Sequence, residues 1–258
     1  MKKIFILIII ILIGIAGYIL LEENDPVGVG VPDNPNIEND ISEADTNVTI
    51  QSEPTYDYSE GIAKSIPILM YHFFYNEAEG ETAADGNFME ISAFRKQIKY
   101  LKNEGYYFPT WQEIYDFVDG TLDLPKKSIV ITIDDGANSF FALAVPVLEE
   151  EQVKATSFVV TTWTKEDIIN KYKSNIIGFE SHSHDMHKPG TDGMGAILTM
   201  TSEEVVEDLT NSKNITKSSN TFCYPFGHYD DRAKELLSEA GFKLAVTTQF
   251  GNCEPRNG

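Results

Sequence analysis

Runs of apolar residues alternate along the chain with segments in which apolar positions recur at helical spacing. The runs are rich in Ile, Val, Phe and other β-branched or aromatic residues, which is typical of buried strands. Most are too short to be helices of ordinary length. Strands are predicted at 66–71, 128–133, 155–161, 176–179, 221–224 and 243–248.

Helix start and stop signals separate these strands. Ser92 is the predicted cap of one helix, which Gly105 ends. Capping-box patterns open two more helices at Thr110 and Thr201, and 138–151 is also predicted to be helical. Strands that alternate with helices in this way imply a parallel sheet covered by helices.

The fold class follows from what is present and what is missing. No glycine-rich phosphate loop follows any predicted strand, which argues against a dinucleotide-binding fold. The chain is short for a complete eight-stranded barrel. We therefore predict an α/β fold that is a distorted or incomplete (β/α) barrel.

The N-terminus carries an uninterrupted apolar run at 4–21, with Lys2 and Lys3 before it and acidic residues after it. A helix of this length spans roughly 27 Å, close to the hydrocarbon thickness of a bilayer. The charges place the N-terminus inside, so residues 1–21 are predicted to be a single-pass signal anchor in the cell membrane. The rival interpretation is a cleaved signal peptide, for which 16–18 is a poor cleavage site. Either way, the rest of the chain is exported.

Residues 22–60 hold eleven Asp or Glu and no Lys or Arg. Such a segment cannot bury enough apolar area to offset its ordering entropy, so it is predicted to be a disordered acidic linker before a domain at 61–258. The whole chain carries a formal charge of −20, which argues against nucleic acid as a partner. Its two cysteines allow at most one disulfide and exclude a cysteine zinc cluster.

Two adjacent carboxylates, Asp134 and Asp135, follow the strand at 128–133. At the end of a strand the chain is leaving the sheet, so both side chains can reach one pocket. Two carboxylates this close cannot both ionise cheaply unless a cation lies between them. One can ligate a metal ion while the other accepts a proton from water. The alternative is an ordinary turn or helix cap.

Three histidines, His182, His184 and His187, lie within six residues. Neutral imidazole is a favoured zinc ligand. The spacing between His182 and His187 suits a loop, and His184 would point elsewhere, so we interpret it as a residue behind the site or in solvent. The alternative is a set of incidental loop histidines. Together with the aspartates, the cluster points to a metal-assisted hydrolase.

The segment 222–227 (Phe-Cys-Tyr-Pro-Phe-Gly) can form the wall of a groove, with a backbone N–H facing a developing oxyanion. With the strand at 68–72, the Asp-Asp-Gly turn, 155–158 and the histidine segment, it resembles the NodB-like polysaccharide deacetylases, carbohydrate esterase family four. The resemblance covers about 64–258.

The resemblance implies hydrolysis of N-acetyl groups on an amino-sugar polysaccharide with a divalent metal, most often zinc. It implies Asp134 as general base and Asp135, His182 and His187 as metal ligands. The backbone N–H of Phe226 would meet the oxyanion. We expect a monomer.

The separation of His182 and His187 is similar to that in the branch acting on poly-β-1,6-N-acetylglucosamine. In that branch a histidine near the start of the domain is the general acid, and His72 matches it. An arginine that many relatives carry before the turn is absent here. The chain also stops at Gly258, soon after its last predicted strand, so we expect a domain shortened at its C-terminal end.

The identity of the glycan stays open, since poly-N-acetylglucosamine and peptidoglycan both fit. Two alternatives to the deacetylase are kept. One is a glycan-binding protein of this fold with little or no turnover, and the other is an esterase on another acetylated glycan.

Overall fold

The computed structural model describes residues 17–20, 55–217 and 221–256. Its main feature is a seven-stranded sheet in the order β1-β9-β8-β7-β6-β5-β2, in which β1 and β9 are antiparallel and every other neighbouring pair is parallel. A separate two-stranded parallel sheet joins β3 and β4. The strands are β1 Gly17–Leu20, β2 Ile68–Tyr71, β3 Phe73–Tyr75, β4 Phe88–Glu90, β5 Val130–Ile133, β6 Ala155–Val159, β7 Ile177–Ser181, β8 Thr221–Cys223 and β9 Leu244–Thr247.

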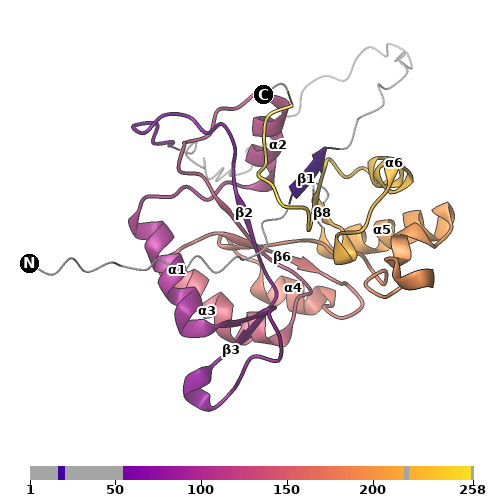
Figure 1. The fold of residues 1–258 in the computed structure, drawn as a ribbon, viewed down its shortest axis with the longest axis horizontal. Helices are drawn as coiled ribbons and strands as arrows, with labels where there is room; N and C mark the ends of the chain where they lie inside the picture. Colours follow the sequence, from indigo (N-terminus) through magenta and orange to yellow (C-terminus); the bar gives the residue numbers. More distant parts are fainter. Residues whose placement is uncertain (1–16, 21–54, 218–220, 257–258) are drawn as a thin grey trace, which may run out of the picture.

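Helices cover the sheet in two groups. Figure 1 shows α1 and α3 side by side near β2, and α5 and α6 together at the other end of the sheet, beyond β8. The helices are α1 Ile91–Asn103, α2 Trp111–Asp119, α3 Val145–Glu151, α4 Glu166–Tyr172, α5 Ser202–Thr216 and α6 Asp231–Glu239. Five short helical turns are η1 Glu77–Glu79, η2 Phe140–Ala144, η3 Thr191–Gly193, η4 Ala196–Leu198 and η5 Pro225–Gly227. This parallel-sheet half-barrel with helices confirms the predicted α/β class.

The core lies on both faces of the sheet. On the outer face, α1 buries Phe94, Ile98 and Leu101 at helical spacing against β5 and α3. Each such side chain contributes about 1.5–3 kcal/mol when fully buried. A second outer layer packs α5 and α6 against β8 and β9. These layers hold the strands in register, which fixes where their carboxyl ends lie.

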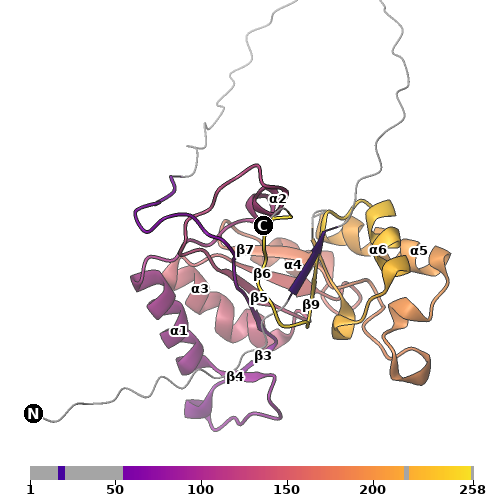
Figure 2. The ribbon, with the colours of Figure 1, turned by 45° about the horizontal axis from the view of Figure 1, so that its top comes forward.

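The inner face of the half-barrel is filled by α2. Its Trp111, Ile114 and Phe117 are buried with apolar side chains from β2, β5, β6, β8 and β9. Two backbone hydrogen bonds, of 2.8 and 2.9 Å, join Ile66 and Cys253 and bring the C-terminal segment against the chain that leads into β2. Figure 2 shows α2 and the C-terminus next to each other above the strands.

Several element boundaries differ from the prediction. The helix α1 is capped by the carboxylate of Glu90, which accepts from the Ala93 N–H, and not by Ser92. The capping boxes at Thr110 and Thr201 are confirmed. The strands β3 and β4 and the helix α4 were not predicted, because their apolar runs are too short to carry a clear period.

The N-terminal prediction falls mostly outside the described residues. Within the run at 4–21, residues 17–20 form the strand β1 beside β9, and not part of a helix. The edge of β9 offers unpaired backbone groups, and a short apolar segment can satisfy them. None of the helices in the described part of the chain is long and apolar enough to cross a membrane.

Contacts with the folded domain begin before the predicted boundary at residue 61. The Tyr56 hydroxyl donates to Glu113 (2.8 Å), and its ring lies 5.3 Å from that of Tyr107. The Tyr58 hydroxyl donates to the carbonyl of Asp123. The acidic composition of 22–60 led to the prediction of disorder for the whole segment, although these two aromatic side chains pack near the start of α2. The rest of the predicted linker, 22–54, lies outside the described residues.

Candidate metal centre and active site

The predicted site residues gather at one edge of the sheet. His72 follows β2, Asp134 and Asp135 follow β5, and His182 follows β7. Because these strands are parallel, their carboxyl ends lie at the same edge. The strand β6 lies between β5 and β7, so the two halves of the site face each other across its end.

A left-handed turn lets both aspartates serve one pocket. Asp135 has φ of +72° and Gly136 has φ of +66°. A Cβ atom at Gly136 would lie 2.5 Å from Thr164 Oγ1 and 2.8 Å from Val159 Cγ1, so any other residue would displace these side chains and strain the turn. A left-handed non-glycine residue costs of order 1–3 kcal/mol and persists where its surroundings enforce it. The turn keeps Asp135 from pointing to the opposite face from Asp134.

Three side chains from two distant segments converge at this turn. Asp135 Oδ1 lies 3.5 Å from His182 Nε2 and 3.2 Å from His187 Nε2. Asp135 and His182 are buried, while the His187 side chain is 18% exposed. One ligand atom from each residue lies within 4.8 Å of the others. The group therefore has the spacing that a metal ion needs, with its open side at His187.

The hydrogen bonding of His182 supports a cation at this position. Its Nδ1 lies 2.8 Å from the Cys223 carbonyl oxygen, which can only accept, so Nδ1 carries the proton and Nε2 presents a lone pair. That lone pair faces Asp135 Oδ1, which is buried and has no hydrogen-bond partner among the described residues. Two facing acceptors repel each other unless a positive charge lies between them. The donor set, one carboxylate and two imidazoles, fits zinc or a similar divalent ion.

The pKa shifts of Asp135 and His182 also support a cation between these two residues. Burial works to raise the pKa of Asp135, but His182 and His187 beside it hold that pKa well below its usual range. Burial works to lower the pKa of His182, but Asp135 and Asp134 raise it above its usual value. Both directions mean that the site favours one positive charge between carboxylate and imidazole. A proton or a metal ion can supply it.

Asp134 lies beside this group and is 3% exposed. Its Oδ2 accepts a hydrogen bond from Cys223 Sγ (3.3 Å) and lies 4.0 Å from His72 Nε2. Its Oδ1 is buried without a hydrogen-bond partner in the part of the chain that the structure describes. Burial, reinforced by the charge of Asp134, raises the pKa of the Cys223 thiol, so the thiol is neutral and donates. One carboxylate oxygen is thus held by the thiol, while the other receives no hydrogen bond from a described residue.

The remaining histidine of the cluster points away. His184 Nδ1 lies 2.8 Å from Thr161 Oγ1, outside the group around Asp135. Its backbone N–H donates to Asp208 Oδ1 (2.6 Å), and that of Asp185 donates to Asp208 Oδ2 (2.7 Å). Ser183, with φ of +79°, turns the chain just after His182. Asp208 on α5 therefore holds the loop that carries the histidines.

Two exposed aromatic rings flank His187. The Trp163 ring centroid lies 5.2 Å from that of His187, and the Phe226 centroid lies 4.6 Å from it. Trp163 is 57% exposed and Phe226 is 43% exposed. Phe226 sits in η5 with φ of +60°. Exposed rings at the open side of a polar site can stack on a sugar ring.

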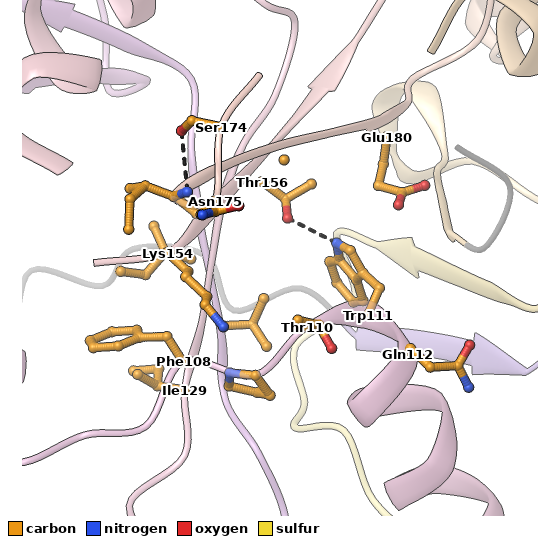
Figure 3. Close-up of a pocket in the computed structure, with 16 residues that line it drawn as sticks. Phe108, Thr110, Trp111, Gln112, Ile129, Lys154, Thr156, Ser174, Asn175 and Glu180 are labelled. Carbon is orange, nitrogen blue, oxygen red and sulfur yellow. Dashed lines mark hydrogen bonds between the residues drawn. The ribbon is translucent and has the colours of Figure 1, made fainter. Parts of the chain in front are cut away.

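Two cavities lie near the ends of the strands. One, of about 210 Å³, adjoins the site through Gly136 and Trp163. The larger, of about 550 Å³, lies at the amino ends of β5, β6 and β7 (Figure 3). There Trp111 Nε1 donates to Thr156 Oγ1 (3.0 Å), and Lys154 and Glu180 are the ionisable residues of its lining. No imidazole or thiol lines this cavity, so we place the candidate chemistry at the opposite edge despite the difference in size.

Comparison with known proteins agrees with these features. Residues 121–245 match the family model described as polysaccharide deacetylase. This stretch of the chain is similar to the polysaccharide deacetylases. This finding confirms the resemblance drawn from the motifs.

Relatives and solved structures extend the comparison. The poly-β-1,6-N-acetyl-D-glucosamine N-deacetylase of Staphylococcus aureus (strain MRSA252) is 31% identical over 176 residues, with 61% of this chain and 60% of the relative covered. The chain therefore spans about 60% of the length of that relative.

Two solved structures share the fold. The structure of IcaB from Ammonifex degensii superposes with a TM-score of 0.66 at 22% identity, covering 76% of this chain and 89% of that one. The structure of the Streptococcus pyogenes deacetylase PplD in complex with acetate superposes with a TM-score of 0.58 at 23% identity. The superposition covers 69% of this chain and 80% of that one.

Three residues in or beside this site were not predicted from the sequence. The thiol of Cys223 and the ring of Trp163 carry no spacing signal that separates them from core or surface residues. Asp208 carries such a signal, because its spacing places it on the buried face of α5 with Val205, Leu209 and Ser212. An acidic residue in an apolar stripe signals a buried hydrogen-bonding role.

Proposed function

We propose that the chain is a metal-dependent hydrolase that removes N-acetyl groups from an N-acetylglucosamine polysaccharide. The observation that carries this proposal is the convergence of Asp135, His182 and His187 with the spare carboxylate of Asp134 beside them. The family match over 121–245 and the name of the staphylococcal relative support the same reaction.

The metal ligands in this proposal are Asp135, His182 and His187. When bound, a divalent ion such as zinc supplies Lewis-acid polarisation of the acetyl carbonyl. Asp134 is the general base: its Oδ1, which has no hydrogen-bond partner among the described residues, takes a proton from the water that attacks that carbonyl. The buried position of Asp134 limits competing hydrogen bonds from solvent, which supports this role.

Two further groups complete the proposed reaction. His72, whose Nε2 lies 4.0 Å from Asp134 Oδ2, donates a proton to the departing amine. The backbone N–H of Phe226 stabilises the developing oxyanion, and the position of its ring against His187 supports its presence at the reacting centre. Amide and water are consumed, and a free amino sugar and acetate are formed.

The substrate proposed here is a neutral amino-sugar polymer. Trp163 and Phe226 offer exposed rings at the open side of the site, and sugars bind to such rings through their apolar faces. The net charge of −20 disfavours anionic polymers. Both features support a glycan such as poly-N-acetylglucosamine, and we propose that the protein acts as a monomer.

Acetate release by the full-length chain tests the proposal. The substrates are poly-β-1,6-N-acetylglucosamine oligomers, peptidoglycan and acetylated xylan, each with and without added zinc. We expect acetate from the first, with a requirement for a divalent ion. Binding of the oligomer without acetate would favour a glycan-binding protein, and release from xylan alone would favour an esterase.

We also infer a location at the outer side of the cell membrane, anchored through 4–21; in the anchored protein, residues 17–20 would leave the edge of β9 and extend the membrane helix. The apolar run, the lysines before it and the acidic residues after it support this location. Cell fractionation tests it: the chain should stay in the membrane pellet in high salt and be released by detergent. Recovery in the soluble fraction would contradict an anchor.

A further inference from the structure

Cys223 contacts both halves of the site. Its carbonyl oxygen lies 2.8 Å from His182 Nδ1, and its thiol donates to Asp134 Oδ2 over 3.3 Å. Cys223 is the last residue of β8 and is 5% exposed. The backbone of one residue therefore orients a proposed metal ligand, while its side chain touches the proposed base.

The thiol has a defined effect on Asp134. Among the described residues, Asp134 Oδ1 has no hydrogen-bond partner, and the only side-chain hydrogen bond to Oδ2 is that of Cys223. A hydrogen bond at one oxygen restricts rotation of the carboxylate, so that the other oxygen favours one direction. Without the thiol, the Asp134 side chain could turn within its pocket and lose the alignment that proton transfer needs.

We propose that Cys223 is a positioning residue that holds the Asp134 carboxylate through its thiol. The proposal rests on the function proposed above, in which Asp134 is the general base. The backbone and side-chain roles are separable: substitution of the side chain removes the contact with Asp134 and leaves the carbonyl that accepts from His182. Metal binding should therefore survive a change that impairs turnover.

The second cysteine of the chain provides a matched control. Cys253 is also a free buried thiol, with 0% exposure. It packs with the apolar side chains that fill the half-barrel, and its backbone pairs with Ile66. Removing the Cys253 thiol costs packing, as it does at Cys223, but leaves Asp134 untouched.

The experiment compares Cys223→Ala, Cys223→Ser and Cys253→Ala in the full-length chain. It measures kcat and KM for acetate release from a poly-β-1,6-N-acetylglucosamine oligomer, bound zinc by elemental analysis, and folding by circular dichroism. We expect Cys223→Ala to lower kcat about five- to tenfold, the loss of one weak hydrogen bond, with KM and zinc content unchanged. Cys223→Ser should restore most of kcat because a hydroxyl also donates.

The outcomes are distinguishable. A kcat for Cys223→Ala equal to that of Cys253→Ala would overturn the positioning role. Loss of zinc in Cys223→Ala would also overturn it, because the thiol would then be a ligand together with Asp134 and His182, whose atoms lie within 4.8 Å of it. If Cys223→Ala does not fold, Cys223→Val takes its place in the comparison with Cys223→Ser, because valine fills the space of the thiol but cannot donate a hydrogen bond. Absence of acetate release from the unmodified chain would count against the proposed function instead.

Discussion

His182 Nδ1 and the carbonyl oxygen of Cys223 form a 2.8 Å hydrogen bond between residues 41 apart in the chain. The bond links the end of β7 to the end of β8, which are neighbours in the sheet. The sheet itself therefore sets the tautomer of His182 and aims Nε2 at Asp135. A ligand oriented by backbone keeps its direction when side chains around it change.

The three histidines of the loop should separate into two classes. His182→Ala and His187→Ala each remove an atom that faces Asp135 Oδ1, so both variants should bind zinc at least about 100-fold more weakly. Loss of a residue that only hydrogen-bonds to a ligand costs about 10- to 100-fold, and loss of a ligand should cost at least as much. His184→Ala should keep its zinc, because that ring contacts Thr161 and lies outside the group. Elemental analysis after dialysis checks this. Equal loss in all three variants would contradict the ligand assignment.

Asp134→Asn should separate binding from turnover. The amide keeps the size of the side chain but cannot accept a proton from water, so kcat should fall by about 10²- to 10⁴-fold. Asp135 and both histidines are untouched, so zinc content should match that of the parent. Acetate release and elemental analysis are measured on the same preparation. Activity within a fewfold of the parent would exclude Asp134 as the base.

Asp208 should stabilise the histidine loop from behind. Asp208→Ala leaves the N–H groups of His184 and Asp185 without their acceptors. Both hydrogen bonds are only partly buried, so we expect a cost of about 1 kcal/mol for each. Zinc affinity should fall by about 10- to 100-fold, as for other outer partners. The matched control is Glu207→Ala, on the exposed face of the same helix. Urea denaturation and zinc titration measure both effects. Asp208→Ala behaving like the control would remove this role.

The sequence was informative where one signal dominated. The apolar runs predicted the central strands, and the two capping boxes predicted where α2 and α5 begin. The Asp-Asp-Gly turn and the histidine segment predicted which side chains the structure brings together. The strands and helix starts are local patterns with a direct physical cause. The assignment of Asp135, His182 and His187 as ligands, with Asp134 as base, came from the family resemblance.

Other features depended on contacts that no local pattern encodes. The Cys223 thiol meets Asp134 only because β8 and β5 curve toward each other across the half-barrel. Trp163 reaches His187 through the loop after β6. Tyr56 packs on Tyr107 although its neighbours in sequence are polar and acidic. In each case the tertiary fold determines which residues meet. The order of elements along the chain does not by itself say which side chains become neighbours.

The response to pH should reveal the charge that the site favours. Asp135 and Asp134 raise the pKa of His182 above its usual value. In the zinc-free protein, the protonated imidazole therefore adds stability below the usual histidine pKa, and this contribution is lost as the pH rises through the raised value. Zinc needs the neutral imidazole, so its affinity should change in the opposite sense. It should rise by up to about tenfold per pH unit until the pH passes the raised pKa.

Thermal denaturation with and without zinc, from pH 5.5 to 8, measures this difference. The increase in Tm that zinc produces should grow with pH over the lower part of the range and then level off. His182→Ala should show little increase in Tm with zinc at any pH because it has lost a ligand, while His184→Ala should retain both the increase and its dependence on pH. An increase in Tm that is independent of pH would mean that no proton competes with the ion, and would contradict a zinc site built on His182 and Asp135.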